Sequence, residues 1–262
     1  MNLLGMTVSC ADIYVEQNII KPGGNALNVL TCCAGMNQGK CAVIGAVGND
    51  EYGDIIRNHY RTMGIDESRL HTLEGETASK RIHIDSKGDR YFMPDSWTNG
   101  VYGGFRLDEN DWRFAERFDV WVTASLDPNY QDMIRRKGNG TKLAVDFLDT
   151  ADTVLMEKSL SSISYLFASG DEKLAQKVRE YTKSCAITGV VTFGAEGSAA
   201  FIGGERFDEP ARFAANVVDT TGCGDSFIGA FLVTHEMTGD VRKALAAGSA
   251  AALKILDHFG GI

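Results

Sequence analysis

The chain has 262 residues, of which 44% are hydrophobic and 23% charged, with 29 glycines and 4 prolines. This composition excludes an intrinsically disordered chain and a membrane-spanning one. The formal net charge is −9 and no long basic cluster is present, so we expect no nucleic-acid partner. The six cysteines show no C-x-x-C spacing, and the N-terminus lacks the basic region of a signal peptide. We therefore expect a cytoplasmic protein.

Short apolar runs typical of buried strands alternate with segments of helical composition. The runs cover residues 41–47, 120–124, 143–147, 165–168 and 190–193, and the helical segments cover 25–36, 172–181 and 241–256. This alternation predicts an α/β fold with a mainly parallel central sheet. We expect one domain over residues 1–262.

Residues 76–104 break this rhythm with an alternating, turn-punctuated pattern that predicts a hairpin closed by Lys87 and Gly88. With residues 12–22 this segment is expected to form a small β-sheet lid. Such a flap either closes over a ligand or pairs with another subunit, so a homodimer through the lid is an open alternative.

The stretch VVDTTGCGDSFIGAF, residues 217–231, predicts a strand-like run followed by an apolar helix. Gly222, Cys223 and Gly224 would lie at the helix N-terminus, where unpaired backbone N–H groups and the helix dipole attract an anion. Asp225 has two interpretations at this point. A carboxylate in the first turn is an ordinary way to stabilise a helix, and it is also a candidate base.

This stretch resembles the signature D-T-x-G-A-G-D of the PfkB, or ribokinase-like, carbohydrate kinases. Residues Asp219 to Asp225 match it, and only Cys223 departs, in place of alanine. The resemblance implies a ribokinase-like three-layer α/β/α fold. It also implies that the amides of Gly222, Cys223 and Gly224 form an anion hole for the transferred phosphoryl group and that Asp225 is the catalytic base, roles that suit phosphoryl transfer.

A second constellation lies in KPGGNALNVLTCCAG, where Gly23 and Gly24 precede a predicted helix. Asn25 and Asn28 would lie on one face of that helix and could bond sugar hydroxyls, although both could also serve as helix caps. The resemblance implies that these four residues bind the sugar. It implies the same for Asp12, which ends the first predicted strand and by itself could be a turn residue.

For the nucleotide, VVTFGAEGSAAFI resembles the family segment V-T-x-G-x-x-G through Thr192, Gly194 and Gly197. By itself it could equally be a hairpin turn. The resemblance implies that these three residues bind ATP together with Thr220, Gly222 and Gly224.

The resemblance also implies a magnesium ion that accompanies ATP and is organised through water by Glu172, in a family segment N-x-x-E. Ser169 stands here in place of the asparagine. By itself Glu172 would be a solvated helix start. Activation by a monovalent cation stays open, and the five histidines show no metal-binding spacing.

The segments CADIY, PGGNALNV and DTTGCGDSFI resemble the fructoselysine or fructosamine 6-kinase subgroup. The resemblance implies transfer of the γ-phosphoryl of Mg-ATP to the 6-hydroxyl of fructoselysine or a related fructosyl-amine. Arg81 or Arg90 could meet the carboxylate of such a substrate and Asp95 its ammonium, or all three could be solvated. The alternatives are another acceptor (fructose, a sugar acid or a nucleoside), a non-catalytic sugar-binding relative, and a dinucleotide-dependent oxidoreductase, whose G-x-G-x-x-G fingerprint is missing after the first strand.

Overall fold

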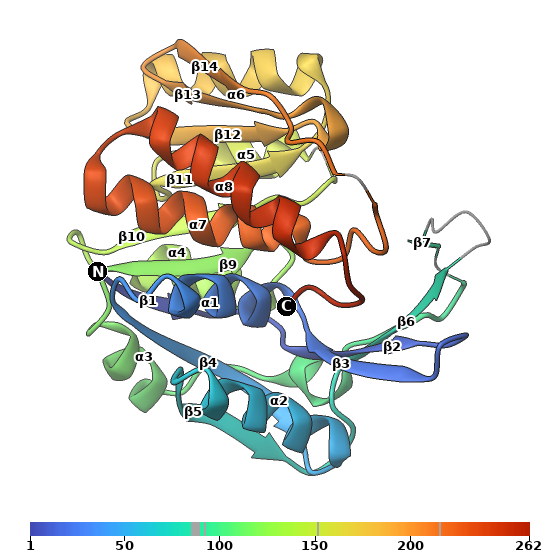
Figure 1. The fold of residues 1–262 in the computed structure, drawn as a ribbon. Coiled ribbons are helices and arrows are strands. Elements are labelled where there is room, and N and C mark those ends of the chain that lie inside the picture. Colours follow the sequence, from blue (N-terminus) through green and yellow to red (C-terminus); the bar gives the residue numbers. More distant parts are fainter. Residues whose placement is uncertain (85–89, 92, 151, 215) are drawn as a thin grey trace.

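The computed structural model describes residues 1–84, 90–91, 93–150, 152–214 and 216–262. A large sheet with helices on both faces forms the body, and a second, smaller sheet projects from one end of it (Figure 1). In the described part of the chain, no helix combines the length and apolar character needed to cross a bilayer.

The central sheet has the strand order β14-β13-β12-β11-β10-β9-β1-β4-β5. Its parallel strands are β1 (Asn2–Gly5), β4 (Lys40–Gly48), β5 (Asp66–Leu73), β9 (Val120–Ala124), β10 (Lys142–Asp146), β11 (Tyr165–Ser169) and β12 (Thr188–Thr192). Two antiparallel strands, β13 (Ser198–Ile202) and β14 (Glu205–Glu209), complete one edge. The mainly parallel sheet predicted from the apolar runs is thus confirmed. The runs were informative because strands covered on both faces are apolar along their whole length.

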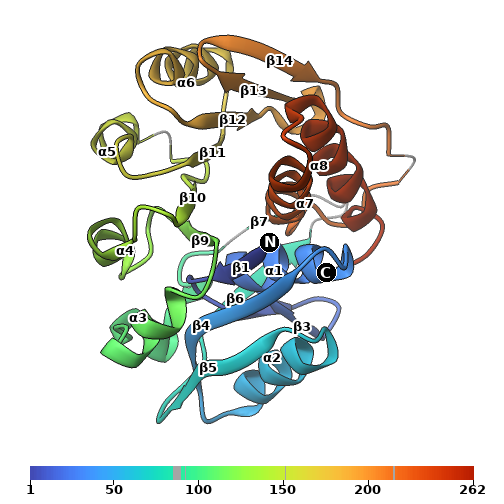
Figure 2. The same cartoon turned by 90° about the vertical axis from the view of Figure 1, so that its left-hand side faces the viewer.

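Helices cover both faces of this sheet (Figure 2). On one face lie α3 (Glu109–Ala115), α4 (Tyr130–Arg136), α5 (Thr153–Ser159) and α6 (Glu172–Ser184). On the other lie α1 (Asn25–Gly35), α2 (Glu51–Thr62), α7 (Cys223–Thr238) and α8 (Val241–Ile255). Each layer has its own hydrophobic cluster against the sheet. The expected three-layer α/β/α fold is confirmed.

The second sheet contains β2 (Cys10–Tyr14), β3 (Ile19–Gly23), β6 (Ser79–Ile84), β7 (Arg90–Tyr91) and β8 (Trp97–Thr98). Its pairs are antiparallel except β2 with β6. It corresponds to the predicted lid, and the short helix η1 (Gly100–Gly104) follows it. The expected turn at Lys87 and Gly88 lies outside the described residues. One expectation was wrong: Asp12 does not end the first strand but lies inside β2, because the chain enters the lid soon after β1.

Candidate active site

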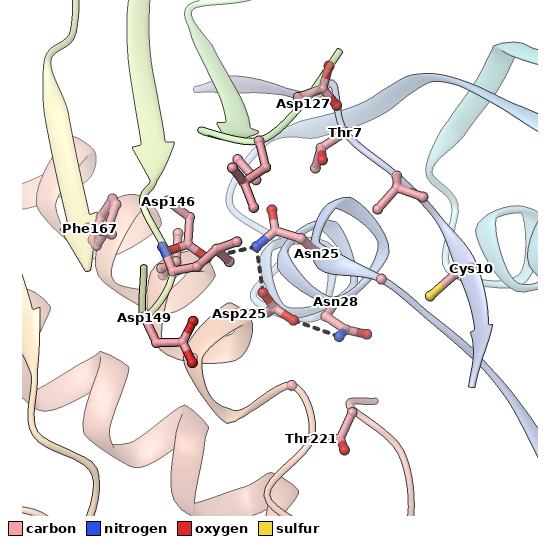
Figure 3. A pocket seen from close by; sticks show the side chains of 18 of the residues that line it. Thr7, Cys10, Asn25, Asn28, Asp127, Asp146, Asp149, Phe167, Thr221 and Asp225 are labelled. Carbon is pink, nitrogen blue, oxygen red and sulfur yellow. Dashed lines mark hydrogen bonds between the residues drawn. The ribbon is translucent and has the colours of Figure 1, made fainter. Parts of the chain in front are cut away.

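A pocket of about 820 Å³ opens at the carboxyl ends of the parallel strands and extends under the lid. Residues at or just after five strands line it: Thr7, Asp127, Asp146, Ser169 and Thr192. Ligands of open α/β sheets bind at this edge. The lining continues along the starts of α1 and α7, so segments far apart in the sequence converge on one cavity (Figure 3).

The start of α7 forms one wall of the pocket through Gly222, Gly224 and Asp225. Gly222 precedes the helix in the left-handed region with φ 76°, and a Cβ at this position would overlap Gly261 of the C-terminal segment. Glycine is therefore required here for both conformation and space. A Cβ on Gly224 would meet no atom within 4 Å. The first turn of α7 is thus open to the pocket at Gly224, and a helix start of this kind suits a phosphate group.

The carboxylate of Asp225 is held by the two asparagines of α1. Asn25 donates from Nδ2 to Asp225 Oδ1 and Asn28 donates from Nδ2 to Asp225 Oδ2, each at 2.7 Å (Figure 3). Gly24 is the N-cap of α1, and no side chain caps that helix end. The asparagines therefore orient Asp225 rather than cap their own helix. Their Oδ1 atoms are buried without a protein partner, as expected of acceptors that await a ligand hydroxyl.

Asp219, the first residue of the matched signature, ties the loop before α7 to the lid and the C-terminal segment. Its Oδ1 accepts from the Thr221 backbone N–H at 2.9 Å and from the Thr221 hydroxyl at 2.8 Å. Its Oδ2 accepts from the Tyr14 hydroxyl and from the Gly260 N–H. Burial opposes the charge, yet these hydrogen bonds hold the pKa of Asp219 below its ordinary value. Asp219 therefore fixes the loop that presents the amides of α7.

Asp12 reaches the same pocket from the lid. A Cβ on Gly23 would overlap Asp12 Oδ2, so the glycine leaves the space that this carboxylate occupies. Asp12 is 2% exposed, and its Oδ2 has no protein partner. Burial raises the pKa of Asp12 to about 7, although the charge of Lys80 opposes the shift. An acceptor held ready in this way suits a sugar hydroxyl.

Asp146, at the end of β10, shares the amide of Asn25 with Asp225. Asn25 Nδ2 donates to Asp146 Oδ2 at 3.0 Å, and the Leu148 N–H donates to Asp146 Oδ1 at 2.8 Å. Leu148 has φ 57°, which is rare for a non-glycine residue and often marks a functional site. Burial raises the pKa of Asp146 to about 7, and the nearby charge of Asp225 adds to the shift.

This raised pKa makes stability depend on pH with a defined sign. Between about pH 4 and pH 7 the folded protein keeps a proton on Asp146 that the unfolded chain has released. We therefore expect the free energy of unfolding to fall as the pH rises through this window, by at most about 1.4 kcal/mol per pH unit for this group. Urea titrations across the window should show a shallower fall for Asp146→Asn. Parallel pH curves for the two proteins would contradict the expectation.

On the predicted nucleotide side, Thr192, Thr220, Gly222 and Gly224 line the pocket, whereas its described lining does not include Gly194 or Gly197. These two glycines lie at the turn between β12 and β13, where η2 (Gly194–Glu196) forms. A Cβ on Gly197, which has φ 108°, would overlap the carbonyl oxygen of Glu209. The hairpin geometry alone therefore explains Gly197, and the ATP role of both glycines stays a prediction.

Glu172 opens α6 and forms a two-pronged ion pair with Arg206, with oxygen–nitrogen distances of 2.6 and 2.7 Å. It does not appear in the described lining of the pocket. Within the described residues, no group of three or more His, Cys, Asp or Glu side chains could hold a metal ion. A Mg²⁺ that arrives with phosphate oxygens and keeps several waters needs few protein ligands. The role of Glu172 toward that ion stays a prediction.

Five residues that line the pocket were not predicted as site residues from the sequence: Asp127, Asp146, Asp149, Lys80 and Trp97. The three aspartates carry a readable signal, because each ends or follows a predicted parallel strand. Lys80 and Trp97 offer none, since their place depends on how the lid strands pair.

Fold and site together define a phosphotransferase-like α/β protein, in which a glycine-rich helix start lies beside an oriented carboxylate. The model of the pfkB family of carbohydrate kinases matches residues 3–262, and the chain belongs to this family. It is 34% identical to fructoselysine 6-kinase of Escherichia coli (strain K12) over 258 residues, which cover 96% of each chain. It is 26% identical to the fructosamine kinase FrlD of Bacillus subtilis (strain 168), covering 99% of this chain and 92% of that one.

The fold is also similar to a solved E. coli structure of ribokinase II type, in complex with ATP and Mg²⁺. The TM-score is 0.85 at 18% identity, and the match covers 99% of this chain and 94% of that one. The expected kinase family and ribokinase-like fold are thus confirmed. The oxidoreductase alternative is excluded.

Proposed function

We propose that this carbohydrate kinase transfers the γ-phosphoryl group of Mg-ATP to the 6-hydroxyl of fructoselysine or a related fructosyl-amine. The observation that carries the proposal is the Asp225 carboxylate, held at 2.7 Å by Asn25 and by Asn28 beside the first amides of α7. A base and an anion site side by side are what transfer to an alcohol requires.

In the proposed reaction the sugar lies against the unpartnered acceptor atoms of Asp12, Asn25 and Asn28. The 6-hydroxyl oxygen forms a bond to the γ-phosphorus, the bond from that phosphorus to the ADP oxygen breaks, and the hydroxyl proton passes to Asp225. The amides of Gly222, Cys223 and Gly224 receive the negative charge on the phosphoryl oxygens. Mg²⁺ bound with the nucleotide supplies further positive charge there.

The charge of the pocket favours a cationic acceptor over fructose, a sugar acid or a nucleoside. Its charged lining consists of five aspartates and one lysine: Asp12, Asp127, Asp146, Asp149, Asp225 and Lys80. The pKa of Asp12 and of Asp146 is about 7, so these two carry only part of a charge near neutral pH. The other three aspartates still outnumber Lys80, so the lining disfavours a sugar acid and favours the ammonium of a fructosyl-amine. The names of the two curated relatives support the same substrate class.

An acceptor panel tests the proposal. With Mg-ATP as donor and ADP release as the readout, we expect kcat/KM for fructoselysine to exceed that for fructose, ribose, gluconate and adenosine by at least about tenfold. This factor corresponds to the free energy of one hydrogen bond to a charged group. Equal or better turnover of a plain sugar, a sugar acid or a nucleoside would reject the fructosyl-amine and identify the alternative acceptor class.

Two further proposals accompany this function. None of the six cysteines, all of which lie in the described part of the chain, forms a disulfide, which supports a reducing, cytoplasmic location. A homodimer through the lid stays a prediction, supported by the exposed apolar side chains of Val15 and Ile20 on the lid hairpin.

A further inference from the structure

The lid contains a second hollow that phosphoryl transfer does not require. It measures about 510 Å³ and is lined by Lys80, Met93, Asp95, Ser96 and Trp97. Lys80 and Trp97 also line the main pocket. The hollow, here called the lid groove, is therefore adjacent to the active-site pocket, with these two side chains between them.

A series of neighbouring residues connects the catalytic carboxylate with this groove. Asp225 accepts a hydrogen bond from Asn28 of α1, and Asp12 lies against Gly23, just before α1. In the lid, Asp12 pairs with Lys80 across β2 and β6, and Lys80 pairs with Trp97 across β6 and β8. Directly paired residues point to the same face of a sheet. A long acceptor with its hydroxyl at Asp225 would therefore reach the groove with its far end.

The chemistry of the groove differs from that of a sugar site. Lys80 offers an ammonium and Asp95 a carboxylate, while Met93 and Trp97 offer exposed apolar surface. Asp95 has φ 64°, in a turn closed by the Ser96 N–H donating to the Met93 carbonyl at 3.1 Å. This turn connects to β6 through the Arg81 N–H, which donates to the Ser96 carbonyl at 2.7 Å. The carboxylate thus stands on a backbone fixed to the strand that carries Lys80.

We propose that the lid groove binds the α-amino acid end of the acceptor, with Lys80 facing its carboxylate and Asp95 its ammonium. The aliphatic stem of the amino acid lies against Trp97. This inference rests on the proposed function and narrows it, because it selects free fructosyl-amino acids over simple fructosyl-amines. Two opposite charges on one small ligand match the two opposite charges of the groove. Arg81, one of the arginines considered from the sequence, is exposed and does not belong to the described groove lining.

The test compares fructoselysine with fructosyl-butylamine, which has the same sugar and linking amine but no charged end. We expect kcat/KM to be at least about tenfold higher for fructoselysine, because only this compound can form charged hydrogen bonds with Lys80 and Asp95. Asp95→Asn should raise KM for fructoselysine about tenfold with little change in kcat, and so remove most of the preference. Asparagine tolerates the left-handed backbone of this position, so the variant should fold.

A matched control and a second variant make the test decisive. Glu16→Gln removes one carboxylate of the lid outside the groove, where Glu16 accepts from His83 at 2.7 Å, and should keep the preference. Lys80→Gln should lower the preference as Asp95→Asn does. If both fructosyl compounds are phosphorylated equally well and Asp95→Asn changes neither, the groove inference fails and the proposed function stands. If neither compound is phosphorylated, the proposed function itself fails.

Discussion

Asp225→Asn is expected to lower kcat by ~10²–10⁴-fold. The amide keeps the size of the side chain but cannot take a proton from the acceptor hydroxyl. In the variant, the amide nitrogen of the new side chain would face the N–H group of Asn25 or Asn28 that now donates to the carboxylate. A flip of that asparagine's amide group presents its oxygen instead and removes the conflict. The fold should therefore persist. Steady-state turnover at saturating sugar and Mg-ATP measures the effect, and thermal unfolding checks the fold.

A matched control exists at the start of the next helix. Asp240 is the N-cap of α8 and accepts from the Arg242 and Lys243 N–H groups at 3.0 and 3.1 Å. Asp240→Asn keeps a good capping residue outside the described pocket lining, so turnover should not change. If Asp225→Asn resembles this control, with turnover within about fivefold of the unmodified enzyme, Asp225 is a helix-start residue and not the base.

The start of α7 was predictable from sequence because its information is local, whereas the strand-like run expected just before it was wrong, since residues 216–222 form no strand. Gly222, Cys223, Gly224 and Asp225 are consecutive, and a glycine-rich turn before an apolar helical pattern indicates where the N–H groups point. The observed α7 starts at Cys223, within this stretch. The apolar runs were equally informative, since a strand buried on both faces needs no alternation.

Other parts of the site depend on the order of strands, which no local pattern encodes. Asp146 meets Asn25 only because β10, β9 and β1 are neighbours in the sheet and because α1 follows β1 through the lid. Gly261 packs against Gly222 and Asn28, although more than thirty residues separate it from either along the chain. Local sequence patterns indicate at most an isolated role for each of these residues. Their joint role needs the tertiary structure, because loop entropy and packing decide between many possible pairings.

Gly224→Ala is expected to change stability and activity in opposite directions. Gly224 lies in the first turn of α7 at a position where a Cβ would meet no atom within 4 Å. Alanine is favoured over glycine in a helix by about 0.5–1 kcal/mol, so the free energy of unfolding should rise slightly. Gly224 lines the pocket, so the added methyl group would occupy space next to the proposed phosphoryl site. We therefore expect kcat to fall about 10²-fold, the scale of losing a preorganised donor.

Gly35→Ala is the matched control for this opposition. Gly35 is the exposed last residue of α1, and a Cβ there would also meet no atom within 4 Å. It lies outside the described pocket lining, so its variant should gain similar stability and keep full turnover. Denaturant titrations and kcat measured on the same preparations separate the two effects. Should Gly224→Ala retain the turnover of Gly35→Ala, no phosphate passes close to the α7 amides, and the anion hole must lie elsewhere in the pocket.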